Sequence, residues 1–98
     1  MLVAEQDGLV LGFLVAMRAR VPPVFDPGPT MFVDDFYVAA PDRWADVGAL
    51  LFTRLREIAV ECHWRQLIVV SGTGDEPKNG FLSSVGLSPT STWWTGAA

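Results

Sequence analysis

The segment from Met31 to Leu51 constrains the fold of this chain more than any other. Its first part, Met31–Ala39, is rich in aromatic and branched residues, which favours a β-strand. Pro41 interrupts the strand, and a helix is predicted from about Asp46 to Cys62 because apolar residues then recur at helical spacing. The apolar stripe comprises Val47, Leu50, Leu51, Leu55, Ile58 and Cys62. A strand followed by a turn and a helix directs free backbone N–H groups at the helix N-terminus toward an anion.

The segments on either side of this unit predict further strands. Asp7-Gly8 separates Met1–Gln6 from Leu9–Arg20 and is a strong hairpin signal. The stiff, proline-rich stretch Val21–Pro29 predicts a loop between the hairpin and Met31. A short apolar strand, Gln66–Ser71, follows the helix, so the chain makes a βαβ crossover with a parallel strand pair.

The C-terminal third predicts one short helix and one more strand. Asp75 opens the helix, with Pro77 in its first turn, and Gly86 closes it. Ser91–Thr95 is expected to form the last strand. Residues 1–98 are therefore interpreted as a single α/β domain with a mixed sheet of five or six strands, one long helix and one short helix.

The sequence DDFYVAAPDRWADVGALL resembles the central motif of the Gcn5-related N-acetyltransferases (GNAT), which bind acetyl-coenzyme A. In that family an acidic strand ending in an aromatic–Val pair leads into Arg/Gln-x-x-Gly-x-Gly/Ala at the start of the longest helix. Arg43 and Gly48 match this motif, and Asp46 replaces its middle glycine.

Farther along the chain, DEPKNGFLSSVGL is similar to the family's second motif, Asn-x-x-x-x-x-Phe-Tyr-x-x-x-Gly-Phe. Phe81 and Gly86 match, while Asp75 stands at the Asn position and Leu82 at the Tyr position. The acidic pair and the Glu-Pro dipeptide most resemble the diamine (spermidine) acetyltransferases. The resemblance covers nearly the whole chain, and the family's first strand and first two helices have no counterpart ahead of Met1, so an N-terminally truncated version of the fold is expected.

The resemblance implies how acetyl-coenzyme A would be held as co-substrate. The backbone of Phe36, Tyr37 and Val38 would hold the pantetheine arm where two parallel strands splay apart. Backbone N–H groups of residues 44 to 49 would hold the pyrophosphate. The residues expected to bind the cofactor are Phe36, Tyr37, Val38, Arg43, Trp44, Ala45, Asp46, Val47, Gly48, Ala49 and Asp75.

Asp34 and Asp35 are the candidate catalytic residues. The resemblance aligns Asp34 with the general base that takes a proton from the amine, and Asp35 with a carboxylate that holds a cationic substrate. Because neighbouring side chains on a strand point to opposite faces, only one of them is expected to face a given amine. The structural alternative is that one or both pair with Arg18 or Arg20 on the adjacent strand.

Two departures from the family pattern affect the predicted activity. Asp46 places a negative charge where the pyrophosphate is expected, at a cost of about 1 kcal/mol at short range, partly offset by Arg43. An aspartate there also suits a helix N-cap, so a capped helix that binds no coenzyme is an alternative. Leu82 cannot protonate the departing thiolate as a tyrosine would, so that proton would have to come from water or another donor.

Composition narrows the classes of function. A net charge of −4 without a Lys/Arg cluster argues against nucleic-acid binding. The longest apolar run, Leu9–Met17, is too short to span a bilayer, and no signal peptide is recognised. Cys62 is the single cysteine and is expected to be a core thiol, which fits a reducing cytoplasm. His63 has no second ligand at a suitable spacing, so no metal site is predicted.

The leading interpretation is an N-acetyltransferase that moves an acetyl group from acetyl-coenzyme A to a small amine or polyamine. The alternatives are a non-catalytic relic of the fold that acts as an interaction or regulatory subunit, and a coenzyme A-binding module without turnover.

Burial or interface packing is expected for Trp44, Trp64, Trp93 and Trp94. Since Leu9–Met17 is apolar on both faces and two helices give little cover, a homodimer is expected.

Overall fold

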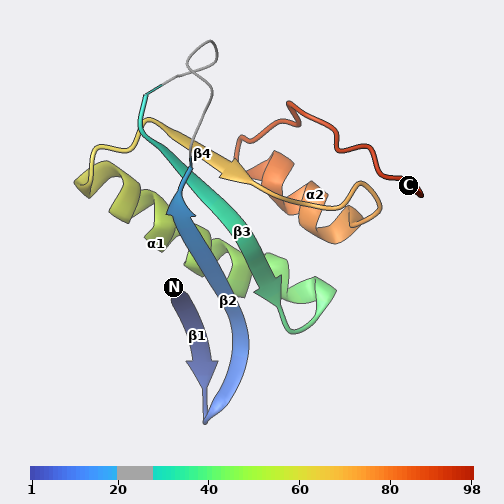
Figure 1. Cartoon of the computed structure of the whole chain (residues 1–98). Helices are drawn as coiled ribbons and strands as arrows, with labels where there is room; N and C mark the ends of the chain where they lie inside the picture. Colours follow the sequence, from blue (N-terminus) through green and yellow to red (C-terminus); the bar gives the residue numbers. More distant parts are fainter. Residues whose placement is uncertain (20–27) are drawn as a thin grey trace.

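One mixed β-sheet, crossed by a long helix, organises the computed structural model, which describes residues 1–19 and 28–98 (Figure 1). The strands are β1 (Leu2–Gln6), β2 (Leu9–Arg18), β3 (Thr30–Val38) and β4 (Gln66–Val69), in the spatial order β1-β2-β3-β4. The helices are the 3₁₀ turn η2 (Pro41–Trp44), α1 (Val47–Glu61) and α2 (Glu76–Ser84). The first three strands are antiparallel, and β4 is parallel to β3, which confirms the predicted crossover through α1.

The β1–β2 hairpin forms where the Asp-Gly dipeptide predicted it. Asp7 has φ 52° and Gly8 has φ 80°, and two positive φ values are typical of the type I′ turn that joins antiparallel strands. Gln6 pairs with Leu9 directly beside the turn. Strand β2 ends at Arg18 in the described chain, and Arg20 lies outside the described residues, as does most of the loop predicted over Val21–Pro29.

Helix α1 begins after Asp46, which is its N-cap, and ends at Glu61, within one residue of the prediction at either end. Its buried stripe advances mainly in steps of four: Val47, Leu51, Leu55 and Ala59, with Gly48 and Phe52 beside it. Leu50 lies on the opposite flank and is 65% exposed. The prediction that Cys62 is a core thiol is wrong, because it lies past the last helical turn and is exposed.

Four aromatic rings hold the helices against β3. Phe36 meets the ring of Trp44 edge-on at 4.9 Å between centroids, and Phe81 of α2 stacks on Trp44 at 5.4 Å. Phe52 of α1 completes the cluster, 6.0 Å from Phe81. All four are buried, so one apolar cluster joins β3, η2, α1 and α2. We call these four residues the aromatic cluster.

The cluster also explains a glycine in the first turn of α1. A Cβ placed on Gly48 would lie 2.7 Å from Cε3 of Trp44. Real Cβ atoms do not approach a ring carbon so closely, so the ring of Trp44 occupies the space that a side chain would need. Gly48 is therefore required by the packing of Trp44, independently of any ligand.

The sheet face turned away from α1 is only partly covered in the described part of the chain. On this face Phe13 contacts Tyr37 across the β2–β3 pair, with 5.4 Å between ring centroids. Tyr37 is 49% exposed and Met17 50% exposed, while Phe13 and Val15 are half-buried. We predicted that both faces of β2 are covered. Within the described residues, only the face toward α1 is covered, and the opposite face is partly exposed.

The last strand predicted over Ser91–Thr95 is not present, so the described sheet has four strands rather than five or six. Trp93 and Trp94 are 78% and 92% exposed, so they are not buried within the chain and their packing at an interface stays a prediction, while Trp44 is buried and Trp64 half-buried. Residues 91–95 have strand-like composition, but a strand also needs a hydrogen-bonding partner, and in the described chain the segment has none.

Two glycine substitutions in the helices should have opposite effects on stability. Gly48→Ala should lower the free energy of unfolding by about 1–2 kcal/mol, because the added methyl group collides with Trp44 and outweighs the better helix propensity of alanine. Gly80→Ala, in α2 with open space around it, should raise that free energy by about 0.5–1 kcal/mol. Urea unfolding of both variants measures the difference, and a Gly48→Ala protein as stable as the parent would contradict this packing.

Candidate functional site

Strand β3 loses its partner on one side halfway along its length. Its pairing with β4 runs from Thr30 opposite Gln66 to Val33 opposite Val69, and the Val70 N–H then donates to the Val33 carbonyl at 3.1 Å. Beyond this point β3 continues to Val38, and in residues 1–19 and 28–98 the strand beside it there is β2 alone. The two parallel strands therefore separate, and the separation exposes a backbone edge of β3 that we call the β3 opening.

Phe36 and Val38 present their backbone groups to this opening. The Ala39 N–H donates to the Leu11 carbonyl at 2.8 Å, so Ala39 is directed toward β2. In an antiparallel pair, alternate residues bond to the same neighbour, so Tyr37 is also directed toward β2. The N–H and C=O groups of Phe36 and Val38 consequently face the opposite edge. The separation lies where the family resemblance placed it, and ligand binding by these residues stays a prediction.

A β-bulge places the two candidate catalytic aspartates. Asp35 pairs with Val15, whereas the next residue of β2, Ala16, pairs with Val33, so Asp34 is the extra residue. A bulge interrupts the strict alternation on which the opposite-face expectation was based, so the directions of the two carboxylates stay a prediction. Both aspartates are exposed.

The structural alternative for these aspartates gains no support from Arg18. Within residues 1–19 and 28–98, Arg18 forms no ion pair with either carboxylate and lies opposite Met31 instead. Arg20, the second arginine proposed as a partner, lies outside the described residues. Neither Asp34 nor Asp35 therefore forms an ion pair with a described arginine.

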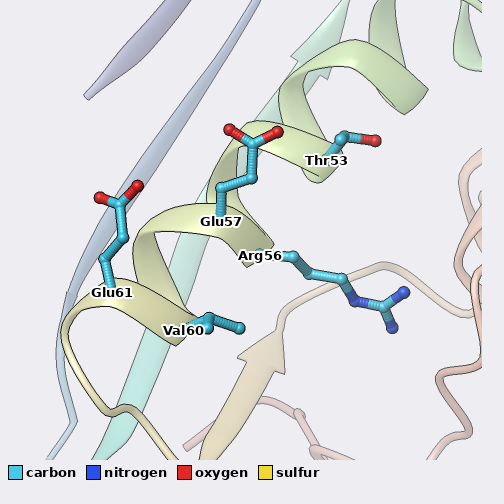
Figure 2. A pocket seen from close by; sticks show the side chains of 5 residues that line it. All are labelled: Thr53, Arg56, Glu57, Val60 and Glu61. Carbon is cyan, nitrogen blue, oxygen red and sulfur yellow. The ribbon is translucent and has the colours of Figure 1, made fainter.

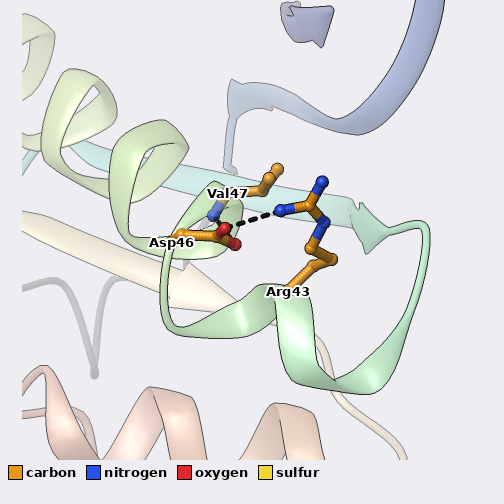
Figure 3. A network of polar contacts seen from close by, with 3 residues as sticks. All are labelled: Arg43, Asp46 and Val47. Carbon is orange, nitrogen blue, oxygen red and sulfur yellow. Dashed lines mark hydrogen bonds and ion pairs between the residues drawn. The ribbon is translucent and has the colours of Figure 1, made fainter. Parts of the chain in front are cut away.

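The N-terminus of α1 is occupied by a carboxylate of the chain itself (Figure 3). Asp46 Oδ1 accepts the Val47 N–H at 2.6 Å, and Asp46 Oδ2 accepts from Arg43 Nη1 at 2.7 Å. The hydrogen bond from Val47 is the main cause that lowers the pKa of Asp46 from its ordinary value of 3.8; partial desolvation opposes it, and Arg43 adds to the lowering. Asp46 is thus a helix cap that also neutralises Arg43.

Two backbone donors at this helix end are left over. The Leu50 N–H donates to the Asp46 carbonyl and makes the first bond inside the helix. The N–H groups of Gly48 and Ala49 precede it, and no acceptor for them is found in the part of the chain that the structure describes. Ala49 is half-buried, and Gly48 is buried against Trp44. These two donors can bind an anion that approaches the helix end.

The other residues expected to bind the cofactor lie around the same helix end. Ala45 is exposed in the turn between η2 and α1, Val47 is buried, and the ring of Trp44 is turned into the aromatic cluster. Only the backbone of Trp44 is therefore available to a ligand. Asp75 lies apart from this turn, at the start of α2, where its Oδ1 accepts the Lys78 N–H at 3.3 Å.

Lys78 is a charged residue of the site that the motif comparison did not single out. It lies in α2, is only 9% exposed, and is four residues before Leu82, on the same helix face. Burial lowers the pKa of its ammonium group from the ordinary value of 10.5, and the negative charges of Asp75 and then Asp35 counteract part of that effect. The sequence signal for this position is that Lys78 comes three residues before Phe81 and four before Leu82, which places all three on one helix face.

Asn79 fixes the turn that leads from β4 into α2. Its Nδ2 donates to the Gly72 carbonyl at 2.9 Å, and its Oδ1 accepts from the Ser71 hydroxyl. The loop after β4 is therefore tied to the first turns of α2, which holds Asp75 and Lys78 in place beside the β3 opening.

A shallow hollow on the outer surface of α1 is separate from this site (Figure 2). It is lined by Thr53, Arg56, Glu57, Val60 and Glu61. Arg56 is already engaged, since its Nη2 donates to the Val85 carbonyl at 2.7 Å and its guanidinium lies 4.7 Å from the centre of the Phe52 ring. The hollow contains no arrangement of groups suited to catalysis.

The described residues form neither a metal site nor a membrane-spanning helix. In residues 1–19 and 28–98 no group of three or more His, Cys, Asp or Glu side chains is placed to hold a metal ion. None of the helices in these same ranges has the length and apolar character needed to cross a membrane.

Comparison with solved structures identifies the fold. An integron cassette protein from the mobile metagenome of V. cholerae matches with a TM-score of 0.76 at 20% identity, over 98% of this chain and 59% of that one. An aminoglycoside N-acetyltransferase in complex with CoA matches with a TM-score of 0.79 at 16% identity, over 98% and 72%. A ribosomal-protein-alanine N-acetyltransferase from Brucella melitensis matches with a TM-score of 0.73 at 20% identity, over 98% and 68%.

The described part of the chain, with its four-stranded mixed sheet and two α-helices, therefore has the GNAT acetyltransferase fold, as the sequence predicted. The chain spans 59% to 72% of the length of these three proteins. No model of a known protein family matches the sequence, and no curated protein matches it either.

Proposed function

We propose that this chain is an N-acetyltransferase that uses acetyl-coenzyme A to acetylate a small amine or polyamine. The observation that carries the proposal is the β3 opening, where Phe36 and Val38 present backbone groups that no other described residue pairs with, close to the start of α1. An extended ligand rich in amide groups can bond to such an edge as an added strand does. The single cysteine is the basis for proposing a cytoplasmic location.

The coenzyme would be held by backbone groups at both ends of the site. The pantetheine arm carries amides that suit the N–H and C=O groups of Phe36 and Val38. The pyrophosphate suits the N–H groups of Gly48 and Ala49, together with the positive end of the helix. Arg43 adds a cation when its pairing with Asp46 loosens. One structural neighbour, an aminoglycoside N-acetyltransferase, was solved in complex with CoA, which supports this assignment.

The acceptor would approach from the side of the two aspartates. Asp34 is proposed as the general base that removes a proton from the attacking ammonium group, and Asp35 as the carboxylate that attracts it. Both are exposed, and a net charge of −4 favours a cationic acceptor. Several structural neighbours are aminoglycoside acetyltransferases, and aminoglycosides carry amines, which supports an amine acceptor of this general class.

One observation favours a second candidate function. Asp46 caps α1 and pairs with Arg43, so a pyrophosphate must compete with a carboxylate that already lies there. This arrangement suits a chain of the same fold that binds coenzyme A weakly or not at all, and that acts as an interaction or regulatory subunit. Coenzyme binding distinguishes the two functions, and turnover distinguishes an enzyme from a coenzyme-binding module.

We also propose that the chain forms a homodimer through the sheet face turned away from α1. That face carries the partly exposed side chains of Phe13, Val15, Met17 and Tyr37. Burial of such a surface contributes about 25 cal/mol per Å², which favours association. A two-fold related copy is the simplest partner for a surface of this kind.

The first prediction of this proposal concerns coenzyme binding. Asp46→Asn retains an N-cap oxygen but removes the charge, so it should tighten coenzyme A binding about fivefold, equivalent to roughly 1 kcal/mol. Glu61→Gln changes the net charge equally at the other end of α1, about 22 Å away, and should leave the affinity unchanged. Titration calorimetry measures both. The absence of heat at millimolar coenzyme for the parent and for Asp46→Asn would contradict the proposed function.

The second prediction concerns the general base. Asp34→Asn should lower kcat by roughly 10²- to 10⁴-fold with little change in coenzyme affinity, because the amine keeps its proton. Asp42→Asn makes the same charge change at an exposed position of η2 and should preserve activity. The assay is release of free coenzyme A thiol over a pH range. Turnover that is indifferent to Asp34→Asn would remove Asp34 as the base.

The third prediction concerns the assembly. Light scattering at micromolar concentration should give twice the chain mass of 10.7 kDa. Replacement of Met17 by Glu places a charge on the proposed interface, at a residue already 50% exposed, and should shift the mass toward the monomer without unfolding the chain. A parent protein that elutes and scatters as a monomer would rule out the dimer.

A further inference from the structure

We propose that Lys78 is the proton donor to the coenzyme A thiolate that departs during acetyl transfer. The inference rests on the proposed function and extends it by naming the group that completes the reaction. Lys78 is the only lysine of the chain. Among the described residues, it is also the one charged residue that is buried. Its side chain is almost fully covered while its Nζ still reaches solvent, and within residues 1–19 and 28–98 it forms no ion pair, so this cation is held beside β3 without a structural partner.

The position of Lys78 follows from how α2 packs. Phe81, one turn farther along α2, meets Phe36 of β3 edge-on with 6.0 Å between ring centroids. The helix face that bears Lys78, Phe81 and Leu82 therefore faces β3 next to its opening. The charge of Asp35, the neighbour of Phe36 in β3, acts on Lys78, and so does the charge of Asp75 at the start of α2. Lys78 thus lies on the side of α2 where a thioester held by Phe36 and Val38 would end.

Other donors in the described part of the chain are poorly placed. Leu82, four residues farther along the same face, is buried and apolar and has no proton to give. Tyr37 packs on Phe13, on the sheet face turned away from α1 and the aromatic cluster. His63 and Cys62 are exposed at the far end of α1. Of these groups, Lys78 is the one that carries an acidic proton on the face of α2 turned toward β3.

Atoms and charges balance in the proposed step. The neutral amine nitrogen attacks the thioester carbonyl carbon and forms the C–N bond. The attacking nitrogen, which is positively charged after it forms this bond, gives up one proton to water. The C–S bond breaks, its electron pair stays on sulfur, and a proton moves from Lys78 Nζ to that sulfur. The neutral lysine recovers a proton from water, which is possible because no described side-chain nitrogen is sealed from solvent without a partner.

The environment of Lys78 suits this role. Burial makes the ammonium group a stronger acid than a free lysine, because it lowers the pKa of Lys78 from its ordinary value. The negative charges of Asp75 and then Asp35 oppose this lowering, because they favour the protonated form. These two carboxylates are the charged groups that act on Lys78 from α2 and from β3.

Kinetics of two lysine variants and one rescue variant test the donor role. Lys78→Met keeps an unbranched stem of similar length, and Lys78→Arg keeps the charge but does not release its proton. Both should lower kcat with acetyl-coenzyme A by roughly 10²- to 10⁴-fold while the calorimetric affinity for coenzyme A changes less than about threefold. An aryl thioester, whose thiolate leaves without protonation, should react at nearly the parent rate. Leu82→Tyr should restore much of the activity of Lys78→Met.

A readout that does not depend on turnover uses the single lysine. Labelling with ¹³Cε-lysine gives one signal, which needs no assignment. Coenzyme A should change the chemical shift of this signal and the pH dependence of that shift. Desulfo-coenzyme A, which lacks the thiol, should change both much less. Equal shifts with both ligands, or full activity of Lys78→Met, would overturn the role of Lys78. A chain that binds no coenzyme at all would instead overturn the proposed function, so the two failures are distinguishable.

Discussion

The packing of Trp44 against Gly48, Phe36 and Phe81 is the contact on which the rest of the structure depends. It anchors the short turn η2, and through that turn it sets where α1 begins. It also holds α2 beside the outer half of β3, since Phe81 belongs to the same cluster. A glycine that family resemblance assigns to ligand binding is here required by packing. The two roles are compatible, because only the backbone N–H of Gly48 would meet a ligand.

The candidate site arises from what this packing leaves unpaired. Strand β4 stops at Val69 while β3 continues to Val38, so the sheet contains a backbone edge that neither strand satisfies. The loop after β4 does not continue along that edge and is tied to α2 by Asn79 instead. At the adjacent helix end, Asp46 satisfies one N–H group and leaves those of Gly48 and Ala49. The balance between this internal carboxylate and an external anion decides whether the chain binds coenzyme.

The strand, turn and helix of residues 31–61 were predictable because periodicity and capping are local properties. The hairpin at Asp7-Gly8 was predictable for the same reason. The bulge at Asp34 was not, since it depends on the register with β2. Composition suggested a strand around Trp93 and Trp94, but a strand needs a partner, and that is a property of the whole fold. Lys78 was missed because its burial follows from the packing of α2.

Backbone amide NMR with coenzyme A tests the central claim most directly, because the proposed contacts are made by N–H groups rather than by side chains. In ¹H–¹⁵N spectra of the labelled chain, the largest shifts on addition of coenzyme A should fall on the amides of Phe36, Val38, Gly48 and Ala49. The amides of β1 and of the last turn of α1 should be unaffected. Saturable shifts that fall elsewhere, or none at millimolar coenzyme, would contradict the account of the β3 opening as the coenzyme site.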